Sequence, residues 1–356
     1  MLVAVQNDHD LGPQPAYAIL LPGLKSEAHA RLAASRVQRL GVELFEAGAL
    51  ADLNFAQGVA LYPADAGTAE GLLQCAEIAL GAARASVTGL AMYRAEKTAE
   101  VEQLRRVGEE LVRGLENGRI EAYFQPQVAA ATGRPVGAEA LLRCRDQHGA
   151  MLPPEAVVAA AERTNRITDL TTAVLNTALR HAAEWPIRGR LSVNVSTHSL
   201  KDTDFPAVVD AALKIWDRPP SDFTIEITES AFIDEPEKSF AAMRALKALG
   251  VRVSIDDFGT GYSSLSYFTN IPAEELKVDK SFVLNMLTSD ADRRIVQAVV
   301  NLAHGFDLEV VAEGVENQET LTALRHMGCD VAQGFWVGRP MPPAQYLAWL
   351  ETAGSS

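Results

Sequence analysis

Apolar and polar residues alternate along several short segments in the second part of the chain. In residues 223–228 every odd position is apolar and every even position is polar, and residues 192–196, 251–256 and 276–279 show the same alternation. A period of two is typical of a β-strand with one apolar and one polar face. Strands are therefore predicted at residues 121–128, 137–143, 190–196, 223–230, 251–258, 275–279, 308–315 and 330–335.

Helices are predicted between these strands, because apolar residues recur there every three or four positions. The expected helices span residues 154–164, 168–184, 237–249, 290–304 and 318–327. Gly250 and Gly328 stand where helices usually stop. Strands that alternate with helices favour a parallel sheet, and about eight of them fit an α/β fold of the TIM (β/α)8 barrel type. An open, doubly wound sheet is the alternative architecture.

Residues 1–97 are expected to form a smaller α/β unit of their own. Strands are predicted at 16–22 and 55–63, and helices at 26–40 and 66–84. Helical spacing of apolar residues then predicts an amphipathic connecting helix within residues 98–117. This helix either packs on the domain that follows, residues 118–356, or transmits a signal or forms a dimer.

Composition narrows the class of protein. The chain has 356 residues, 48% hydrophobic and 22% charged, which is typical of a globular protein with about two domains. The net charge of −14 opposes binding to a nucleic-acid duplex but not to a small phosphate ligand held through metal ions. Cys75, Cys144 and Cys329 are isolated and predict no thiol or zinc site. Without a signal peptide or membrane span, the chain is expected to be cytoplasmic, with upstream segments of a longer parent protein left open.

Polar strand positions provide the candidate site. If the strands close into a barrel, their polar faces converge near the C-terminal ends, where the active sites of such barrels lie. So many carboxylates in one concavity need a neutralising partner, and an all-oxygen ligand set favours Mg²⁺ or Mn²⁺. The alternative is that these residues are solvated strand ends. The converging residues are Glu139, Asn194, Glu226, Asp256, Lys277, Asp279 and Glu313.

Residues 254–265 lie at the centre of this pattern. Asp256 and Asp257 are adjacent, so both can reach one site only where the strand is ending. Gly259 and Gly261 predict such an end, followed by a mobile loop. The alternative is ordinary turn chemistry, since Asp and Gly both favour turns.

Short motifs along the second domain resemble those of the EAL-domain family. In chain order they are residues 123–126 (YFQP), 139–143 (EALLR), 194–196 (NVS), 226–229 (EITE), 256–261 (DDFGTG), 277–279 (KVD), 313–316 (EGVE) and 333–335 (QGF). The resemblance covers residues 108–352. It implies a modified TIM barrel that hydrolyses the bacterial second messenger cyclic di-GMP to linear pGpG, in signalling linked to biofilm formation and motility.

The resemblance also implies a set of metal ligands. It assigns Glu139, Asn194, Glu226 and Asp256 to one ion, and Asp256 with Asp257 to a second. Two Mg²⁺ or Mn²⁺ ions would activate a water for an in-line displacement, and Ca²⁺ is expected to inhibit.

Three further residues receive catalytic roles from the resemblance. Lys277 would hold a water or a phosphate oxygen, and Glu313 looks like a general base or an outer group of the metal site. Glu229 resembles the residue that braces the Asp-Phe-Gly-Thr-Gly loop. The alternative for Glu229 is a surface carboxylate.

Substrate contacts and their supports are implied in the same way. Arg143 presents a planar fork suited to a phosphate, and Asp279 could accept from a guanine edge. A solvated rim charge is the alternative for Arg143. The residues after it lack a tryptophan that is common in the family, which leaves the rim of the substrate site less defined. The full set is Gln125, Leu141, Arg143, Asp279, Gln333 and Glu316.

The first unit resembles the C-terminal half of a GGDEF domain, the diguanylate cyclase fold, in residues 18–23 and in residues 58–63 with the helix after them. Where that family carries its signature, residues 13–17 read PQPAY, without its glycines or its acidic pair. The resemblance therefore implies a truncated, degenerate domain without cyclase activity. The remaining interpretations of the first unit are a docking or regulatory role, or a structural remnant.

EAL-domain proteins include hydrolases and receptors that bind cyclic di-GMP without cutting it. Because every aligned motif position is retained, the resemblance favours an active phosphodiesterase, expected as a homodimer through this domain. The receptor is the alternative. A third interpretation, in which the first unit and the connecting helix carry the function, predicts normal signalling after loss of Glu139.

Overall fold

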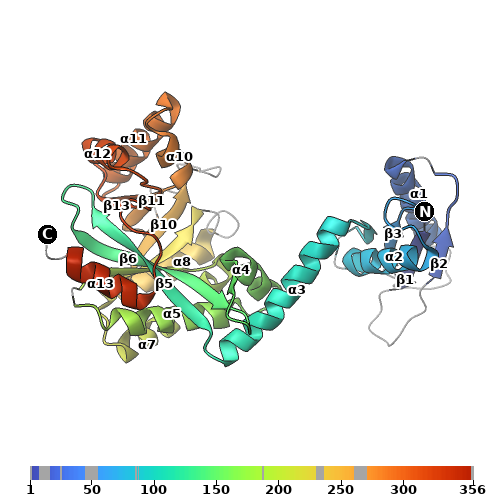
Figure 1. Ribbon diagram of the computed structural model, residues 1–356, viewed down its shortest axis with the longest axis horizontal. Coiled ribbons are helices and arrows are strands. Elements are labelled where there is room, and N and C mark those ends of the chain that lie inside the picture. Colours follow the sequence, from blue (N-terminus) through green and yellow to red (C-terminus); the bar gives the residue numbers. More distant parts are fainter. Residues whose placement is uncertain are drawn as a thin grey trace. The chain divides into compact units, whose positions relative to one another are not determined.

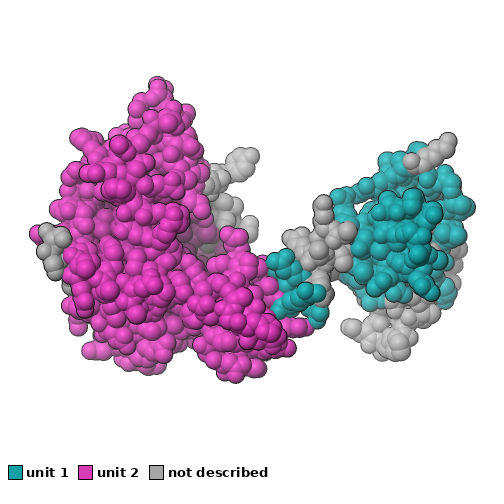
Figure 2. Space-filling view, viewed as in Figure 1, with its two compact units in different colours: residues 1–106 teal, residues 107–356 magenta. Residues whose placement is uncertain are grey.

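The computed structural model describes residues 2–7, 17–24, 26–44, 55–84, 86, 88–186, 188–229, 236–259 and 271–353. The chain divides into two compact units, Met1–Arg106 and Val107–Ser356 (Figure 2). The division falls inside helix α3 (Ala95–Glu116), so this helix belongs to both units. Among the described helices, none combines the length and apolar character that a membrane crossing requires.

In its described residues, the first unit is a four-stranded sheet with helices α1 and α2, besides its part of α3. The strand order is β2-β1-β3-β4, in which β1 is antiparallel to β2 and β3, and β3 is parallel to β4. Its two predicted strands and two predicted helices are confirmed, and β1 and β4 are additional. The bounds are β1 Leu2–Asn7, β2 Tyr17–Leu20, α1 Glu27–Leu44, β3 Phe55–Ala60, α2 Ala69–Arg84 and β4 Leu90–Met92.

Helix α2 packs directly on β3. A Cβ added at Gly58 would lie 2.1 Å from the carbonyl oxygen of Ala76, so only glycine permits this close approach. The buried face of α2 includes Leu72, Ala76 and Leu80. Residues 13–16 of the segment compared above with the cyclase signature lie outside the described residues.

The second unit is an eight-stranded barrel. The ring runs β5-β13-β12-β11-β10-β9-β8-β6, and pairing of β6 with β5 closes it. This closure confirms the barrel and excludes the open sheet. All eight predicted strands are confirmed to within a few residues at each end, and a short ninth strand, β7 (Met151–Leu152), pairs with β6. The bounds are β5 Ile120–Ala129, β6 Pro135–Arg145, β8 Arg190–Asn194, β9 Phe223–Thr228, β10 Arg252–Phe258, β11 Glu275–Val278, β12 Glu309–Ala312 and β13 Val331–Gln333.

Strand β5 departs from the all-parallel sheet predicted from the sequence. It is antiparallel to both of its neighbours, β6 and β13, while the other neighbouring pairs in the ring are parallel. Only a short turn joins β5 to β6, whereas a parallel pair needs a crossover of a dozen or more residues. The prediction was wrong here because it took strand direction from the general βα alternation.

Helices cover the outside of the barrel (Figure 1). Contacts join α5 to β5 and β8, α8 to β10, and α11 to β11 and β12. The apolar strand positions face these helices, which leaves the polar positions inside. The five predicted helices are confirmed. The bounds are α4 Pro154–Arg163, α5 Ile167–Ala182, α6 Thr197–Leu200, α7 Phe205–Ile215, α8 Pro236–Ala248, α10 Lys280–Asn285, α11 Asp290–Gly305, α12 Gln318–His326 and α13 Pro343–Ala353.

The part of α3 that belongs to the second unit packs on the barrel. Leu111 is fully buried there. Glu110 accepts hydrogen bonds from Nη1 of Arg119, at 3.1 Å, and from the backbone N–H of Gln147, at 2.8 Å. The helix is therefore joined to the start of β5 and to the turn after β6.

Four charged residues form the floor of the barrel, each at the first position of its strand: Arg190, Arg252, Glu275 and Glu309. Glu309 accepts from Nη2 of Arg190 at 2.9 Å and from Nη2 of Arg252 at 2.8 Å. An oxygen of Glu275 lies 3.7 and 3.8 Å from the two guanidinium groups. Two positive and two negative charges thus close this end of the barrel.

Glu309→Gln should remove the negative charge that both arginines share. We expect the free energy of unfolding of the second unit to fall by about 2–3 kcal/mol at pH 7. Burial raises the pKa of Glu309, but Arg190 and Arg252 bring it below its ordinary value of 4.5. Its contribution is therefore present above pH 4.5, and the difference between the two proteins should shrink as the pH falls further.

Tryptophan fluorescence in a urea titration measures this difference, because all four tryptophans lie in the second unit. Asp169→Asn is the matched control: Asp169 pairs with Arg166, and both side chains are about half exposed. We expect this control to change stability by less than about 0.5 kcal/mol. Equal losses in the two variants would contradict a special role for the floor.

Candidate active site

Lys277 lies at the centre of the polar residues that converge near the mouth of the barrel. Its Nζ is 2.6 Å from Oε1 of Glu313 and 2.8 Å from Oε2 of Glu226. Oδ1 of Asp256 lies at 3.3 Å and Oε2 of Glu139 at 3.4 Å. The lysine side chain is 1% exposed. Residues from five parts of the chain are thus brought together around one buried ammonium group.

Amide side chains hold Glu139 in place. Nδ2 of Asn194 donates to its Oε1 at 2.5 Å, and Nε2 of Gln333 donates to its Oε2 at 2.6 Å. Gln333 also donates to Oε1 of Gln125 at 3.2 Å and accepts from Nε2 of Gln127 at 2.9 Å. Gln127 was not predicted, although its place two residues after Gln125 puts it on the same strand face.

The site is short of positive charge. Burial lowers the pKa of Lys277, but the four carboxylates around it hold that pKa well above its ordinary value. Burial raises the pKa of Glu139, yet Lys277 and the amide donors bring it below its ordinary value. Burial and Glu139 raise the pKa of Glu226 well above its usual range, and burial raises the pKa of Glu313 to about 7. One ammonium therefore stabilises the ionised form of Glu139 but does not offset the burial of Glu226 and Glu313.

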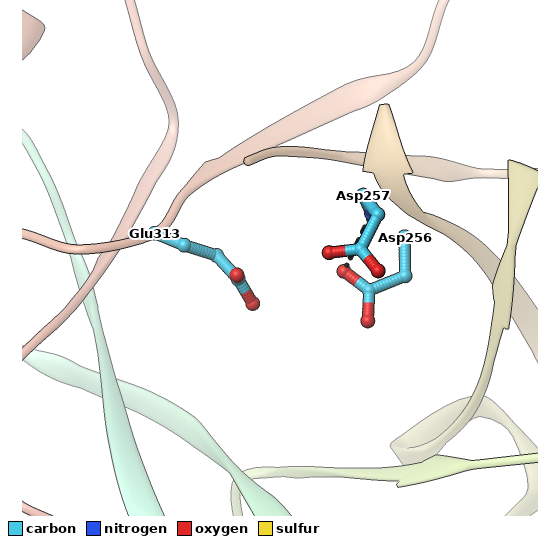
Figure 3. Close-up of side chains that lie close together, drawn as sticks. All are labelled: Asp256, Asp257 and Glu313. Carbon is cyan, nitrogen blue, oxygen red and sulfur yellow. Dashed lines mark hydrogen bonds between the residues drawn. The ribbon is translucent and has the colours of Figure 1, made fainter. Parts of the chain in front are cut away.

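Asp256, Asp257 and Glu313 form an acidic group that could bind a metal ion. One oxygen from each carboxylate lies within 4.8 Å of the others. Figure 3 shows the two aspartates side by side near the end of one strand, with Glu313 across the mouth. The sequence placed Glu313 in the role of a base or an outer group, and the structure brings it into the same group as the aspartates.

An irregular strand lets both aspartates face one site. Asp257 has a left-handed backbone, with φ of 55°, and its N–H donates to Oδ1 of Asp256 at 2.9 Å. The register of β10 against β11 shifts between Ile255 and Phe258. The two side chains share a face because of this bulge within the strand, where the sequence predicted only that the strand was ending. Burial, Asp256 and Asp279 raise the pKa of Asp257.

The donor set fits a hard divalent cation. Oε1 of Glu226 is buried and has no hydrogen-bond partner among the described residues, while its Oε2 accepts from Lys277. Asn194 donates to Glu139 through its amide nitrogen, and its amide oxygen is the atom that could coordinate a cation. Carboxylate and amide oxygens are the ligands that Mg²⁺ and Mn²⁺ prefer.

The remaining predicted residues differ in their placement. Leu141 and Arg143 follow Glu139 on the same face of β6. Asp279 is largely buried and caps α10 by accepting from the N–H of Ser281 at 2.9 Å. Glu316 is exposed, and the structure does not bring it into the cluster.

Glu229 is buried, not a surface carboxylate. Its Oε2 accepts from the N–H of Gly259, just after β10, at 3.4 Å. The rest of the loop, residues 260–270, lies outside the described residues. The structure thus joins Glu229 to the start of this loop.

Known proteins resemble this chain in both sequence and fold. The EAL domain family matches residues 108–340. An "Uncharacterized signaling protein" of Caulobacter vibrioides is 37% identical over 344 residues, which cover 96% of this chain and 41% of that protein. "Cyclic di-GMP phosphodiesterase RocR" of Pseudomonas aeruginosa is 35% identical over 251 residues, 70% of this chain and 64% of that protein. The solved structure "PaMucR Phosphodiesterase, c-di-GMP complex" is 35% identical, with a TM-score of 0.65 over 68% of this chain and 100% of that one.

Glu313→Gln should change how the stability of the metal-free protein depends on pH. The pKa of Glu313 in the folded state, about 7, lies above its ordinary value of 4.5, so the folded state binds more protons between these values. Stability therefore falls as the pH rises through this window. We expect the wild type to lose about 2–3 kcal/mol more than the variant over it.

Urea titrations with a chelator present, followed by tryptophan fluorescence, measure this loss at each pH. Glu319→Gln is the control, because Glu319 is an exposed carboxylate on α12. Its stability should follow the wild type across the window. Parallel curves for the wild type and Glu313→Gln would rule out the raised pKa.

Proposed function

This chain belongs to the EAL domain family, and we propose that its second unit hydrolyses cyclic di-GMP to linear pGpG as a metal-dependent phosphodiesterase. The observation that carries the proposal is the acidic group of Asp256, Asp257 and Glu313 beside the ammonium of Lys277, at the mouth of a closed barrel. A relative named as a cyclic di-GMP phosphodiesterase and a related structure named as a c-di-GMP complex support the substrate.

Two Mg²⁺ or Mn²⁺ ions are the proposed cofactors. Glu139, Asn194, Glu226 and Asp256 would hold one, and Asp256 with Asp257 the other. When bound, the ions neutralise charge on the carboxylates and the phosphodiester and activate the attacking water. One oxygen of Glu226 has no hydrogen-bond partner in the part of the chain that the structure describes, which supports this assignment. Ca²⁺ takes more ligands at longer distances, so we expect it to inhibit.

Substrate would be held at the rim and oriented toward the acidic group. Arg143 offers N–H donors in one plane, which suits two oxygens of a phosphate. Asp279 would accept from a guanine edge, while Gln125 and Leu141 line the approach. Gln333 would support the site indirectly, because its side chain donates hydrogen bonds to both Gln125 and Glu139.

Hydrolysis adds one water across one phosphodiester bond and opens the ring of the substrate. Glu313 takes up the proton of the attacking water, a role that suits a carboxyl group with a pKa near the working pH. The ammonium of Lys277 stabilises the negative charge that grows on the phosphate oxygens in the transition state. The buried position of Lys277 strengthens this interaction, since water screens it poorly there.

For the rest of the chain we propose a supporting role. The first unit would be a truncated, degenerate GGDEF-like domain that docks or regulates, without cyclase activity. The barrel would form a homodimer, in the cytoplasm. A receptor that binds cyclic di-GMP without cutting it is the second candidate, and only a turnover assay separates the two.

Glu139→Ala and Asp256→Ala should each lower turnover by at least about 1,000-fold, because each removes a proposed metal ligand. Chromatography of the purified protein with cyclic di-GMP and Mg²⁺ or Mn²⁺ measures the appearance of pGpG, with chelator and Ca²⁺ as the inactive conditions. Glu319→Ala, at an exposed position of α12, is the control and should keep the wild-type rate. Near wild-type turnover in either ligand variant would refute the metal assignment, and tight binding without product in the wild type would indicate the receptor.

Glu229→Ala should lower the rate by about 10–100-fold, because it removes the acceptor for the N–H of Gly259 beside the metal ligands. Glu229→Gln retains an acceptor oxygen and should lose less. The rate as a function of Mg²⁺ concentration separates an effect on metal binding from one on turnover. Unchanged rate and metal dependence in both variants would exclude the bracing role.

A further inference from the structure

Arg143 lies on an aromatic ring at the rim of the site. Its guanidinium carbon is 5.2 Å from the centre of the Tyr123 ring. The two residues come from the hairpin of β5 and β6, in which Tyr123 pairs with Leu141 and Gln125 pairs with Glu139. Directly paired residues share a sheet face, so Tyr123 lies on the face that leads to Glu139.

This contact holds the guanidinium against a ring and not against a carboxylate. The guanidinium carbon lies over the Tyr123 ring, and the N–H donors of the guanidinium lie in one plane. One of them, on Nη1, donates to the carbonyl of Leu142 at 2.7 Å. Across the described ranges, no carboxylate forms a salt bridge with Arg143. The ring and the carbonyl thus fix the group while its charge and its other donors remain available to an anion.

Tyr123 is itself fixed by a second arginine. Nη2 of Arg145 donates to the Tyr123 hydroxyl at 3.1 Å. Arg145 also donates through Nε to Glu121 at 2.9 Å and through Nη1 to the carbonyl of Gly149 at 3.1 Å. Because Glu121 forms a salt bridge with Arg145, this arginine serves as a support and Arg143 keeps its charge for a ligand.

We propose that Tyr123 is a positioning residue for Arg143: its ring, held by Arg145, keeps the guanidinium over the rim with its edge toward a phosphate of the substrate. The proposal rests on the proposed function of the site. Without the ring, the long side chain of Arg143 would be free to take other rotamers. Binding of the substrate would then have to order it, at a cost in affinity.

Tyr123→Leu and Tyr123→Phe separate the ring from the hydroxyl. Tyr123→Leu keeps an apolar side chain but removes the ring, and we expect KM for cyclic di-GMP to rise about 3–10-fold with kcat within about twofold. Tyr123→Phe keeps the ring but loses the hydrogen bond from Arg145, so KM should rise less than in Tyr123→Leu. Circular dichroism and a thermal melt check that both variants fold. A fall in kcat with unchanged KM in Tyr123→Leu would overturn the proposal.

A double-mutant cycle tests whether Tyr123 acts through Arg143. Arg143→Met removes the guanidinium and should itself raise KM. In that background Tyr123→Leu should change KM by less than about twofold, because the group that it positions is gone. The same rise in KM with and without Arg143 would overturn the proposal and assign Tyr123 a structural or direct role.

The wild type separates failure of this inference from failure of the proposed function. If it makes pGpG, KM and kcat are compared as above. If it binds cyclic di-GMP without cutting it, the hydrolase fails, and the same cycle is read from the dissociation constant measured by calorimetry. If it does neither, both proposals fall. An active or binding wild type with no effect of Tyr123→Leu overturns the positioning role alone.

Discussion

Burial of one ammonium among four carboxylates is the interaction on which the rest of the site depends. Nζ of Lys277 lies within 3.4 Å of oxygens from Glu139, Glu226, Asp256 and Glu313, and the lysine is almost fully buried. One positive charge cannot offset four negative charges where water is largely excluded. The remaining negative charge must be neutralised by protons or by cations. The raised pKa values of Glu226 and Glu313 indicate that protons do this in the metal-free site. The charge imbalance thus disfavours the metal-free site and favours divalent cations.

The floor of the same barrel shows how inward-facing charges are arranged when they balance each other. Arg190 and Arg252 meet Glu275 and Glu309 there, so the formal charges are equal in number, although burial raises the pKa of Glu275. The charged side chains at both ends of the barrel lie inside it for the same reason: every second residue of a barrel strand points inward. The first inward-facing residue of these strands lies at the floor and helps to close it, whereas a later inward-facing residue lies at the mouth. Only the mouth has an excess of one sign, which marks it as the end where a ligand is needed.

Alternation along the strands was sufficient to predict that Asn194, Glu226, Asp256 and Lys277 converge, because a closed ring leaves only one inner face. It could not predict the direction of β5, which depends on the length of the connection to β6 and not on any pattern within the strand. The alternation of apolar and polar residues could not predict contacts between strands either. The position of Arg143 over a ring in the next strand depends on register, which a period of two leaves open by any even number of residues.

Asp257 combines two unfavourable features at one residue. Its left-handed backbone, with φ of 55°, costs a residue other than glycine on the order of 1 kcal/mol. That backbone places its carboxylate beside Asp256, and burial with Asp256 and Asp279 raises its pKa, so ionisation there is also disfavoured. A regular strand would avoid both costs by turning Asp257 toward the helices. Strain and charge repulsion are both offset if a cation lies between the two carboxylates. The backbone of Asp257 therefore adds an argument from geometry to the argument from charge for a metal site.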